Sequence, residues 1–401
     1  MRMVIVGAGV AGSVMARRLS LLPGAEVTCL ERVTRNDHSD AGTGLNIGPN
    51  AVKALKLADA ELARAITRAS LPWKSWRISL TDGTELFSIR LEEIAENAGW
   101  RIRWSELYRV LREAAGASVH YGCEITAICR ASSDSRKTKV TWRQDNGTTG
   151  QIDDIDLLIG GDGRYSLVRR IISGEPKVRQ TGVAVSRILV ADTSGGLIDD
   201  YEQWFSGPNR LLAFRVPPGC IYIACAFPIA PDREIPPQLK TSAALRAAYT
   251  PYSSPPSAQA RWLIERVCTN VDDTHWARMQ EHDVLYRAAD CGVLYLGDAA
   301  HGMVPTLGQG ATQAIEDAAT AAMLIGQRYS RGERDVHRWL AEIEDLRKGR
   351  MQFVMEFSRE ATDTMLAGAD PVAGSRRKNE APFRDRLKAL YDDVGLPLNL
   401  G

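Results

Sequence analysis

The chain has 401 residues, of which 44% are hydrophobic and 25% charged, and its formal net charge is +1. The length allows two domains, or one large domain with an insertion, and the composition is typical of a globular protein. A net charge so close to zero gives no indication of a nucleic-acid partner or a membrane-surface partner.

The termini and the cysteines bear on where such a protein works. The N-terminus runs directly into a strand-like stretch without the features of a secretory leader, and no window approaches about 18 uninterrupted apolar residues. The seven cysteines include no Cys-x-x-Cys pair, which favours reduced thiols over a disulfide framework or a zinc site. We therefore expect a cytoplasmic protein without a metal, present as a monomer or a homodimer.

The first predicted unit is β-α-β, with a strand over residues 3–6, a helix over 11–22 and a strand over 26–30. Between the first strand and the helix stand Gly7, Gly9 and Gly12, in the spacing G-x-G-x-x-G. This spacing gives a tight turn, a close backbone approach to a pyrophosphate, and close packing of helix on strand. Glu31 ends the second strand, where an acid accepts hydrogen bonds from ribose hydroxyls. The pattern predicts a dinucleotide site without separating FAD from NAD.

An amphipathic helix is expected over residues 105–115, followed by several β-type runs between 118 and 155. Asn146-Gly147 is the clearest turn among these runs. A buried strand over 156–159 then leads into Gly160-Gly161-Asp162-Gly163, a second glycine-rich turn, and Ser166 is the expected N-cap of the helix that follows it.

The composition changes over residues 176–275, which are rich in proline, aromatic residues and β-formers. This stretch predicts an inserted sheet rather than a continuation of the parallel sheet. A buried strand returns over 292–296, a helix follows to about residue 328, and further helices are expected over 335–366 and 383–393.

The stretch from Gly292 to Ala318 carries the third motif. Asp298 stands where the strand gives way to a loop, and an acid there suits a sugar-like or ribityl-like polyol. Gly308 and Gly310 then open a helix, whose amides and dipole suit an anionic acceptor. His301 beside this motif is a candidate general base, but a structural role is the stronger interpretation.

With these three motifs in order, the chain resembles the class A flavoprotein monooxygenases, the group of para-hydroxybenzoate hydroxylase. The resemblance covers most of the length. Residues 42–55, GTGLNIGPNAVKAL, look most like the pyridine-acid and hydroxybenzoate hydroxylases, of the 6-hydroxynicotinate 3-monooxygenase and 3-hydroxybenzoate 6-hydroxylase types.

The resemblance implies an α/β fold with a Rossmann-like FAD-binding domain, an inserted β-sheet substrate domain and a C-terminal helical segment. The FAD-binding domain would be discontinuous, with the substrate domain inserted into it. The expected division is 1–78, 100–175 and 276–330 for FAD binding, 79–99 and 176–275 for substrate binding, and 331–401 for the helical region.

The resemblance also implies FAD as the cofactor, NADH or NADPH as a transient reductant, and O₂. The ADP half of FAD is expected at the first glycine motif, the ribityl-pyrophosphate at Asp298, and the isoalloxazine beside residues 308–311. Asp162 and Gly163 would serve both FAD and the reductant. The full set of expected cofactor-binding residues is Gly7, Gly9, Ala11, Gly12, Glu31, Arg32, Gly44, Arg103, Arg109, Asp162, Gly163, Gly297, Asp298, Pro305, Gly308, Gln309, Gly310 and Ala311.

One departure from the family pattern concerns an arginine that contacts FAD at the start of the helix near residue 105. In this chain the strict position is Trp104. Either Arg103 or Arg109 takes over the contact, Trp104 packs against the cofactor, or the segment is an ordinary helix start. The sequence leaves these alternatives open.

Four residues are expected at the reacting end of the site. The family places Pro305 beside the reactive oxygen, and Asn46 occupies a position where pyridine-acid relatives carry a substrate-facing histidine. Arg187 would pair with a carboxylate, and Tyr222 would hydrogen-bond a ring oxygen. The competing interpretations are a turn for Asn46, a solvated sheet face for Arg187 and the core for Tyr222.

The implied function is an FAD- and NAD(P)H-dependent monooxygenase that hydroxylates a small phenolic or hydroxypyridine-type acid through a C4a-hydroperoxyflavin. Such electrophilic chemistry requires a positive or hydrogen-bonding group near the ring oxygen of the aromatic substrate. The alternatives are a flavin-dependent halogenase or an isoprenoid reductase of the same fold, or a non-catalytic flavin-binding module. The halogenase is disfavoured because its Trp-x-Trp-x-Ile-Pro motif is absent from the sequence.

Overall fold

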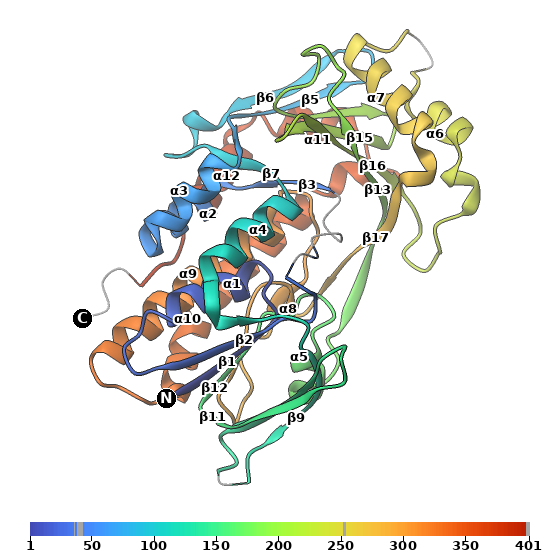
Figure 1. Ribbon diagram of the computed structural model, residues 1–401. Helices are drawn as coiled ribbons and strands as arrows, with labels where there is room; N and C mark the ends of the chain where they lie inside the picture. The colour runs from blue at the N-terminus through green and yellow to red at the C-terminus, as the bar shows by residue number, and fades with distance from the viewer. Residues whose placement is uncertain (36, 38–42, 133, 252–253, 398–401) are drawn as a thin grey trace.

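A computed structural model describes residues 1–35, 37, 43–132, 134–251 and 254–397 (Figure 1). One region of the fold is organised around a parallel five-stranded sheet with the order β18-β12-β1-β2-β8. These strands are β1 (Arg2–Val6), β2 (Glu26–Leu30), β8 (Val119–His120), β12 (Leu157–Gly160) and β18 (Val293–Tyr295).

Both faces of this parallel sheet are covered. Met3 and Ile5 of β1 share a buried cluster with residues of the surrounding helices, whereas Val4 and Val6 belong to a cluster that also contains Ile128. The helices packed near the first face are α1 (Val10–Leu19), α4 (Trp104–Ala115), α9 (Gln309–Ser330) and α10 (Val336–Glu360) (Figure 1). Burial on both faces is the reason why β1 is a continuous apolar run.

A three-stranded antiparallel sheet packs on the second face, in the order β11-β10-β9. Its strands are β9 (Glu124–Arg130), β10 (Thr138–Arg143) and β11 (Thr149–Ile155). Asn146 stands in the turn between β10 and β11, where its side-chain oxygen accepts from the Thr148 amide at 2.9 Å. The predicted hairpin turn is therefore confirmed.

The second large sheet has seven strands in the order β17-β13-β16-β15-β14-β5-β6 and lies at the other end of the molecule (Figure 1). Helices α6 (Ser242–Tyr249) and α7 (Ala258–Thr269) cover one of its faces. The other face lies on the side of the three glycine-containing motifs. The strands are β5 (Ser75–Leu80), β6 (Glu85–Arg90), β13 (Val178–Ala191), β14 (Tyr201–Ser206), β15 (Asn209–Val216), β16 (Cys220–Pro228) and β17 (His275–His282).

A small sheet, β3-β7-β4, connects the two regions. Its strands are β3 (Gly44–Ile47), β4 (Leu71–Trp73) and β7 (Gly99–Arg103). The remaining helices are α2 (Pro49–Ala58), α3 (Ala60–Arg68), α5 (Leu167–Ser173), α8 (Asp298–His301), α11 (Pro371–Arg377) and α12 (Ala381–Asp392). Short 3-10 turns cover Leu91–Glu93, Gly116–Ser118, Pro237–Lys240, Val271–Asp273 and Asp363–Met365.

The predicted α/β class is confirmed, and several element boundaries differ from the prediction. Helix α1 stops at Leu19 instead of residue 22, shortly before Pro23-Gly24. The tract expected over 335–366 ends as an α-helix at Glu360 and continues as a 3-10 turn. Helices α6 and α7 lie inside the stretch expected to be sheet.

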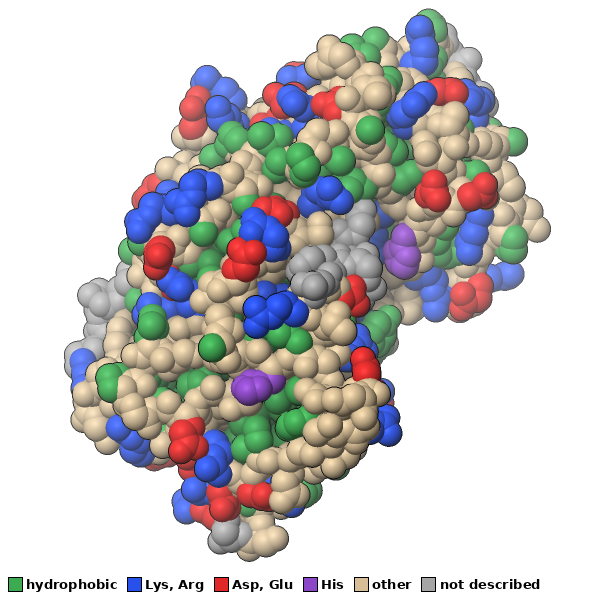
Figure 2. All heavy atoms as spheres, in the orientation of Figure 1, with side chains coloured by type: hydrophobic (Ala, Val, Ile, Leu, Met, Phe, Trp, Pro, Cys, Tyr) green, Lys and Arg blue, Asp and Glu red, His purple; other side chains and the backbone are tan. Residues whose placement is uncertain are grey.

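The surface agrees with the small net charge. On the face shown in Figure 2, Lys and Arg side chains are interspersed with Asp and Glu side chains. Within the described ranges, every helix is too short or too polar to span a bilayer.

Candidate cofactor and substrate site

The first glycine motif packs directly against the second. A Cβ atom on Gly7 would stand 2.7 Å from the carbonyl oxygen of Gly161, and one on Gly12 would stand 1.8 Å from the carbonyl oxygen of Gly7. Gly7 also has a φ of +91°, which favours glycine. Gly7 and Gly12 are therefore required to lack side chains.

Helix α1 begins directly after this turn with Gly9 as its N-cap. No side chain of the described residues caps this end of the helix, so its first amides are available to an anion. Gly9, Val10 and Ala11 line a cavity, which brings the free end of the helix to its wall. A helix N-terminus of this kind suits a pyrophosphate.

Glu31 fixes the same turn from the end of β2. Its carboxylate accepts from the Ala8 amide at 2.6 Å and from the Val33 amide at 3.0 Å. Arg112 of α4 donates to the Ala8 carbonyl at 3.1 Å, and its guanidinium lies 3.9 Å from Glu31. Sequence reasoning missed Arg112, although α4 was predicted. Arg32, by contrast, is exposed.

In the second motif, Asp162 binds the start of α5 and Gly163 lines the cavity. The Asp162 carboxylate accepts from the Ser166 hydroxyl at 2.6 Å and from the Val168 amide at 3.1 Å, at the start of α5. Burial raises the pKa of Asp162, and these hydrogen bonds oppose the rise. Gly163, with a φ of +79°, lines the cavity. Only Gly163 of this pair thus lies on the cavity wall.

Arg169 of α5 ties the second motif to the third. Its guanidinium donates to the carbonyls of Ala299 and Ala300 at 3.2 and 3.0 Å, and lies 3.0 Å from the Asp283 carboxylate. The short helix α8, which starts at Asp298, is thereby held beside α5. Arg169 follows the second motif by a few residues in the chain, but its carbonyl partners lie about 130 residues away and could not be predicted from the sequence.

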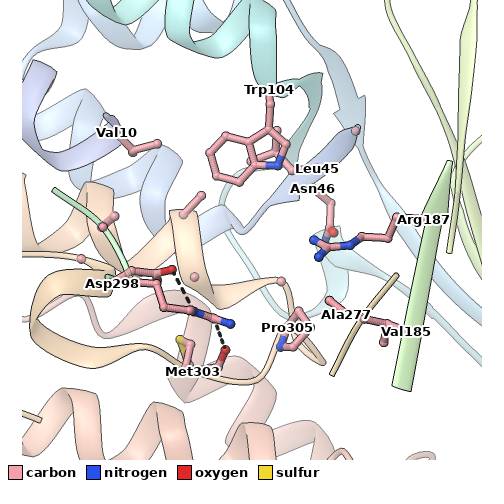
Figure 3. A pocket seen from close by; sticks show the side chains of 18 of the residues that line it. Val10, Leu45, Asn46, Trp104, Val185, Arg187, Ala277, Asp298, Met303 and Pro305 are labelled. Atoms are coloured by element: carbon pink, nitrogen blue, oxygen red, sulfur yellow. Dashed lines mark hydrogen bonds and ion pairs between the residues drawn. The ribbon is translucent and has the colours of Figure 1, made fainter. Parts of the chain in front are cut away.

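Asp298 lines the cavity with its side chain about one-third exposed. Its carboxylate lies 3.7 Å from Nε of Arg164, and Nη2 of Arg164 donates to the Met303 carbonyl (Figure 3). An exposed carboxylate between a strand and a helix start can accept hydrogen bonds from polyol hydroxyls.

His301 belongs to a buried polar cluster, made of His301, Glu316, Asp317 and Arg347. Nε2 of His301 donates to Asp317 at 2.5 Å, and Arg347 donates to Asp317 at 2.9 Å and to Glu316 at 3.0 Å. All four side chains are fully buried and none lines the cavity. The geometry supports the structural role for His301.

This cluster reaches the cavity through the backbone. Asp317 accepts from the Gly297 amide at 2.9 Å, and Gly297 lines the cavity next to Asp298. Gln309 is also fully buried, and its side-chain oxygen accepts from Asn50 and Gln313 at 3.0 Å each. Sequence reasoning gave His301 a structural role but missed Glu316, Asp317 and Arg347, and the four members of the cluster come from α8, α9 and α10.

The cavity has a volume of about 350 Å³ and lies between the motifs and the seven-stranded sheet (Figure 3). It brings together most of the residues expected in a binding site. Those that line it are Gly9, Ala11, Gly44, Asn46, Gly163, Arg187, Tyr222, Gly297, Asp298, Pro305, Gly308, Gly310 and Ala311. Those that do not line it are Gly7, Gly12, Glu31, Arg32, Arg103, Arg109, Asp162 and Gln309.

The structure separates the three candidates for the missing arginine contact. Arg109 lies on another surface, where it pairs with Glu106 and with Glu113 at 2.7 Å. Trp104 lines the cavity and extends over it in Figure 3, with its ring 5.4 Å from that of Tyr108. Arg103 pairs in the small sheet with Gly44, outside the cavity wall. Trp104 is the candidate that the geometry favours.

Asn46 and Gly308 both line the cavity and lie close to each other. A Cβ on Gly308 would stand 2.6 Å from Nδ2 of Asn46, and Gly308 has a φ of +66°. Glycine is thus needed there both for the turn and for the close approach of Asn46. In Figure 3 the Arg187 side chain extends from β13 toward Asn46, above Pro305.

Residues of three neighbouring strands form the sheet side of the cavity. Arg187 of β13, Tyr222 of β16 and Arg210 of β15 all line it. Burial raises the pKa of Tyr222 to about 12, although Arg187 and Arg210 both lower it. Tyr222 is therefore protonated at neutral pH and can donate a hydrogen bond. Sequence reasoning named Arg187 and Tyr222 but missed Arg210.

Comparisons with known proteins agree with this arrangement. A family model described as an FAD binding domain matches residues 261–358. The chain is 30% identical to the 3-amino-4-hydroxybenzoate 2-monooxygenase PtnB3 of Streptomyces platensis, over 90% of this chain and 87% of the relative. It is 29% identical to the 3-amino-4-hydroxybenzoate 2-monooxygenase of Streptomyces cremeus, over 99% and 96%.

A solved structure matches the whole fold. The crystal structure of Klebsiella pneumoniae HpxO complexed with FAD and uric acid has a TM-score of 0.80 against this chain, at 21% identity. The match covers 100% of this chain and 98% of that chain. At this identity the likeness concerns the fold.

Proposed function

The chain belongs to the family of FAD-dependent aromatic monooxygenases, and from that premise we propose that it hydroxylates a small phenolic or hydroxypyridine-type acid with NADH or NADPH as reductant. The observation that carries the proposal is the two-sided cavity. Amide-bearing glycine turns and Asp298 lie on one side, and Arg187, Tyr222 and Arg210 lie on the other. The relatives named above act on 3-amino-4-hydroxybenzoate, which is an amino-substituted phenolic acid.

The chain's residues fit FAD. The side-chain-free turn at Gly7, Gly9 and Gly12, with the open end of α1, would hold the pyrophosphate. Glu31 keeps acceptor capacity beyond its two amide bonds and would accept from the adenosine ribose. Asp298 would bind the ribityl chain, and residues 308–311 at the start of α9 would lie beside the isoalloxazine.

FAD, when bound, supplies the redox chemistry that takes electrons from the nicotinamide and delivers one oxygen atom of O₂ to the aromatic ring. The chain's own residues bind and orient the ring. Tyr222 donates a hydrogen bond to a ring oxygen, and Arg187 provides the positive charge that favours an ionised substrate. Pro305 and Asn46 line the cavity near Arg187 (Figure 3) and would shield the reacting carbon from water.

The proposal is tested by loading the purified protein with FAD and screening hydroxylated benzoates and hydroxypyridine carboxylates. We expect NADH or NADPH oxidation to rise with at least one acid, together with a hydroxylated product that matches the O₂ consumed. A protein that cannot be loaded with FAD contradicts the proposal. A chlorinated product that depends on halide would instead identify a halogenase.

A further inference from the structure

Arg210 lies on the sheet side of the cavity. Strand β16 lies between β15 and β13, and residues of the three strands pair in rows. One row consists of Arg210, Ala226 and Val185. The neighbouring row on the same face consists of Leu212, Ala224 and Arg187. Side chains of directly paired residues share a face of the sheet. Arg187 and Arg210 therefore extend from the two strands that flank β16, on the same face.

The residues between the two arginines are small. Ala224 and Ala226 of β16 are the partners of Leu212 and Arg210, and Ala224 lines the cavity, where its small methyl group leaves room above the central strand. Arg187, Arg210 and Ala224 all line the cavity, and both guanidinium groups influence the ionisation of Tyr222. The room above Ala224 is thus bordered by two positive charges.

Arg210 differs from the other buried arginines of the chain. Six arginines are buried in the described ranges: Arg101, Arg112, Arg169, Arg210, Arg328 and Arg347. Five of them lie within 4 Å of a carboxylate, in the pairs Arg101–Asp200, Arg112–Glu31, Arg169–Asp283, Arg328–Glu342 and Arg347–Asp317.

No carboxylate of the described residues pairs with Arg210. Its side chain is 5% exposed, and its Nε atom is shielded from solvent without a hydrogen-bond partner among those residues. The groups that act on its ionisation are the uncharged Tyr201, Tyr222, Tyr249 and Cys225. A buried charge without a partner costs free energy, and arginine does not lose its proton to avoid that cost.

We propose that Arg210 binds the carboxylate of the aromatic substrate, and that this carboxylate lies above Ala224 between Arg210 and Arg187. This inference rests on the proposed function and names the residue that makes the enzyme select acids. Guanidinium and carboxylate match in geometry and charge, so the ligand supplies the partner that the protein lacks. The ring then extends from this end of the cavity toward Pro305 and Gly308.

The test compares acids with their uncharged amides in the FAD-loaded protein. The probes are 4-hydroxybenzoate, 3-amino-4-hydroxybenzoate and 6-hydroxynicotinate, each with its carboxamide, and the dissociation constant is read from the change in flavin absorbance. We expect at least one acid to bind about tenfold or more tighter than its amide, and R210Q and R210M to lose that preference.

The matched control is R215Q on the same strand. Arg215 is paired with Asp192 at 2.9 Å and does not line the cavity, so R215Q should keep the preference for the acid. All variants should retain FAD. Without ligand, R210M should unfold at the same temperature as the wild-type protein or higher, because the unpaired charge is gone.

The outcomes separate this inference from the proposed function. Equal binding of acids and amides by the wild-type protein, or a preference that persists in R210Q and R210M, contradicts the role of Arg210 even if a ring is hydroxylated. A preference that disappears in R210M without any hydroxylated product supports Arg210 and contradicts the hydroxylase. Absence of any acid binding, or a much lower unfolding temperature of R210M, contradicts the inference.

Discussion

The two sides of the cavity differ in whether their buried charged groups have partners within the protein. On the motif side, Glu31, Asp162 and Asp317 are bound to backbone amides, and the buried arginines have carboxylate partners. On the sheet side, Arg210 is buried without a carboxylate partner among the described residues. The buried charges of the motif side are therefore paired before a ligand arrives, whereas in our proposal Arg210 on the sheet side receives its partner from the ligand.

This contrast predicts which property of the protein a substitution on each side should change. Changes on the motif side should disturb folding and FAD retention, because they break packing and closed hydrogen-bond networks. Changes on the sheet side should alter substrate binding and leave the fold in place. The following predictions test the contrast, beginning with the largest expected effect.

G12A should abolish FAD retention, because its Cβ would stand 1.8 Å from the Gly7 carbonyl oxygen and force the turn apart. The matched control is G349A in α10, where a Cβ meets nothing within 4 Å. Alanine at an exposed helical position should stabilise the fold by up to about 1 kcal/mol. The flavin absorbance of the purified variants measures the effect, and a yellow G12A protein with normal FAD content would contradict it.

R347M should lower the free energy of unfolding by about 3–5 kcal/mol, because it leaves Glu316 and Asp317 buried without their cation. The control R338Q removes an exposed pair with Glu342 and should cost about 0.5 kcal/mol or less. Chemical denaturation of both variants measures the difference. Equal stabilities of R347M and R338Q would show that the buried cluster does not support the motif side.

The stability contributed by Asp317 should depend on pH. Burial alone would raise the pKa of Asp317, but the charges of His301 and Arg347 and the hydrogen bonds it accepts hold it below the usual value. A carboxyl whose pKa is lower in the folded state stabilises the fold above its unfolded pKa of about 3.9, and this contribution falls as the pH drops below that value. The stability difference between wild-type protein and D317N should therefore shrink from pH 6 toward pH 3. A constant difference in denaturation experiments across this range would be the contrary result.

Y222F should lower kcat/KM about fivefold to tenfold through the loss of one hydrogen bond to the substrate, with FAD content and stability unchanged. Because the pKa of Tyr222 is raised to about 12, its ionisation should not shape the pH profile between pH 6 and 9. Steady-state rates across this range check both statements. A pH-profile limb between pH 6 and 9 that disappears in Y222F would contradict the raised pKa.

R109Q should have the smallest effect, with FAD affinity unchanged within about twofold, because Arg109 is bound to Glu106 and Glu113 on another surface. W104A is its counterpart on the cavity wall and should weaken FAD binding. Titration of the FAD-free proteins with FAD compares the two variants. Weaker binding in R109Q than in W104A would restore Arg109 as the contact residue.

The motif side could largely be predicted from the sequence. Each of its three motifs is local in the chain, and the roles of Gly7, Gly12 and Gly308 follow from backbone conformation and packing that glycine alone permits. The division of work between Asp162 and Gly163 could not be predicted, because it depends on where α5 starts.

The sheet side and the buried cluster were harder to predict because their contacts are distant in sequence. The position of Arg210 on the cavity wall depends on the register of β13, β15 and β16. The role of Arg347 depends on its hydrogen bond to Asp317 of α9, 30 residues away in the chain. Helices α6 and α7 had a local signal that was overlooked, since Thr241 and Ser257 are N-caps.

The central claim is that FAD on the motif side and an aromatic acid on the sheet side meet in one cavity. The most direct measurement is incubation of the FAD-loaded protein with ¹⁸O₂, NADH or NADPH and the acid that most stimulates reductant oxidation, followed by mass spectrometry of the product. The account predicts one ¹⁸O atom in the aromatic ring of the acid. Oxidation of the reductant with every acid of the screen, but without ¹⁸O in any ring, would contradict it.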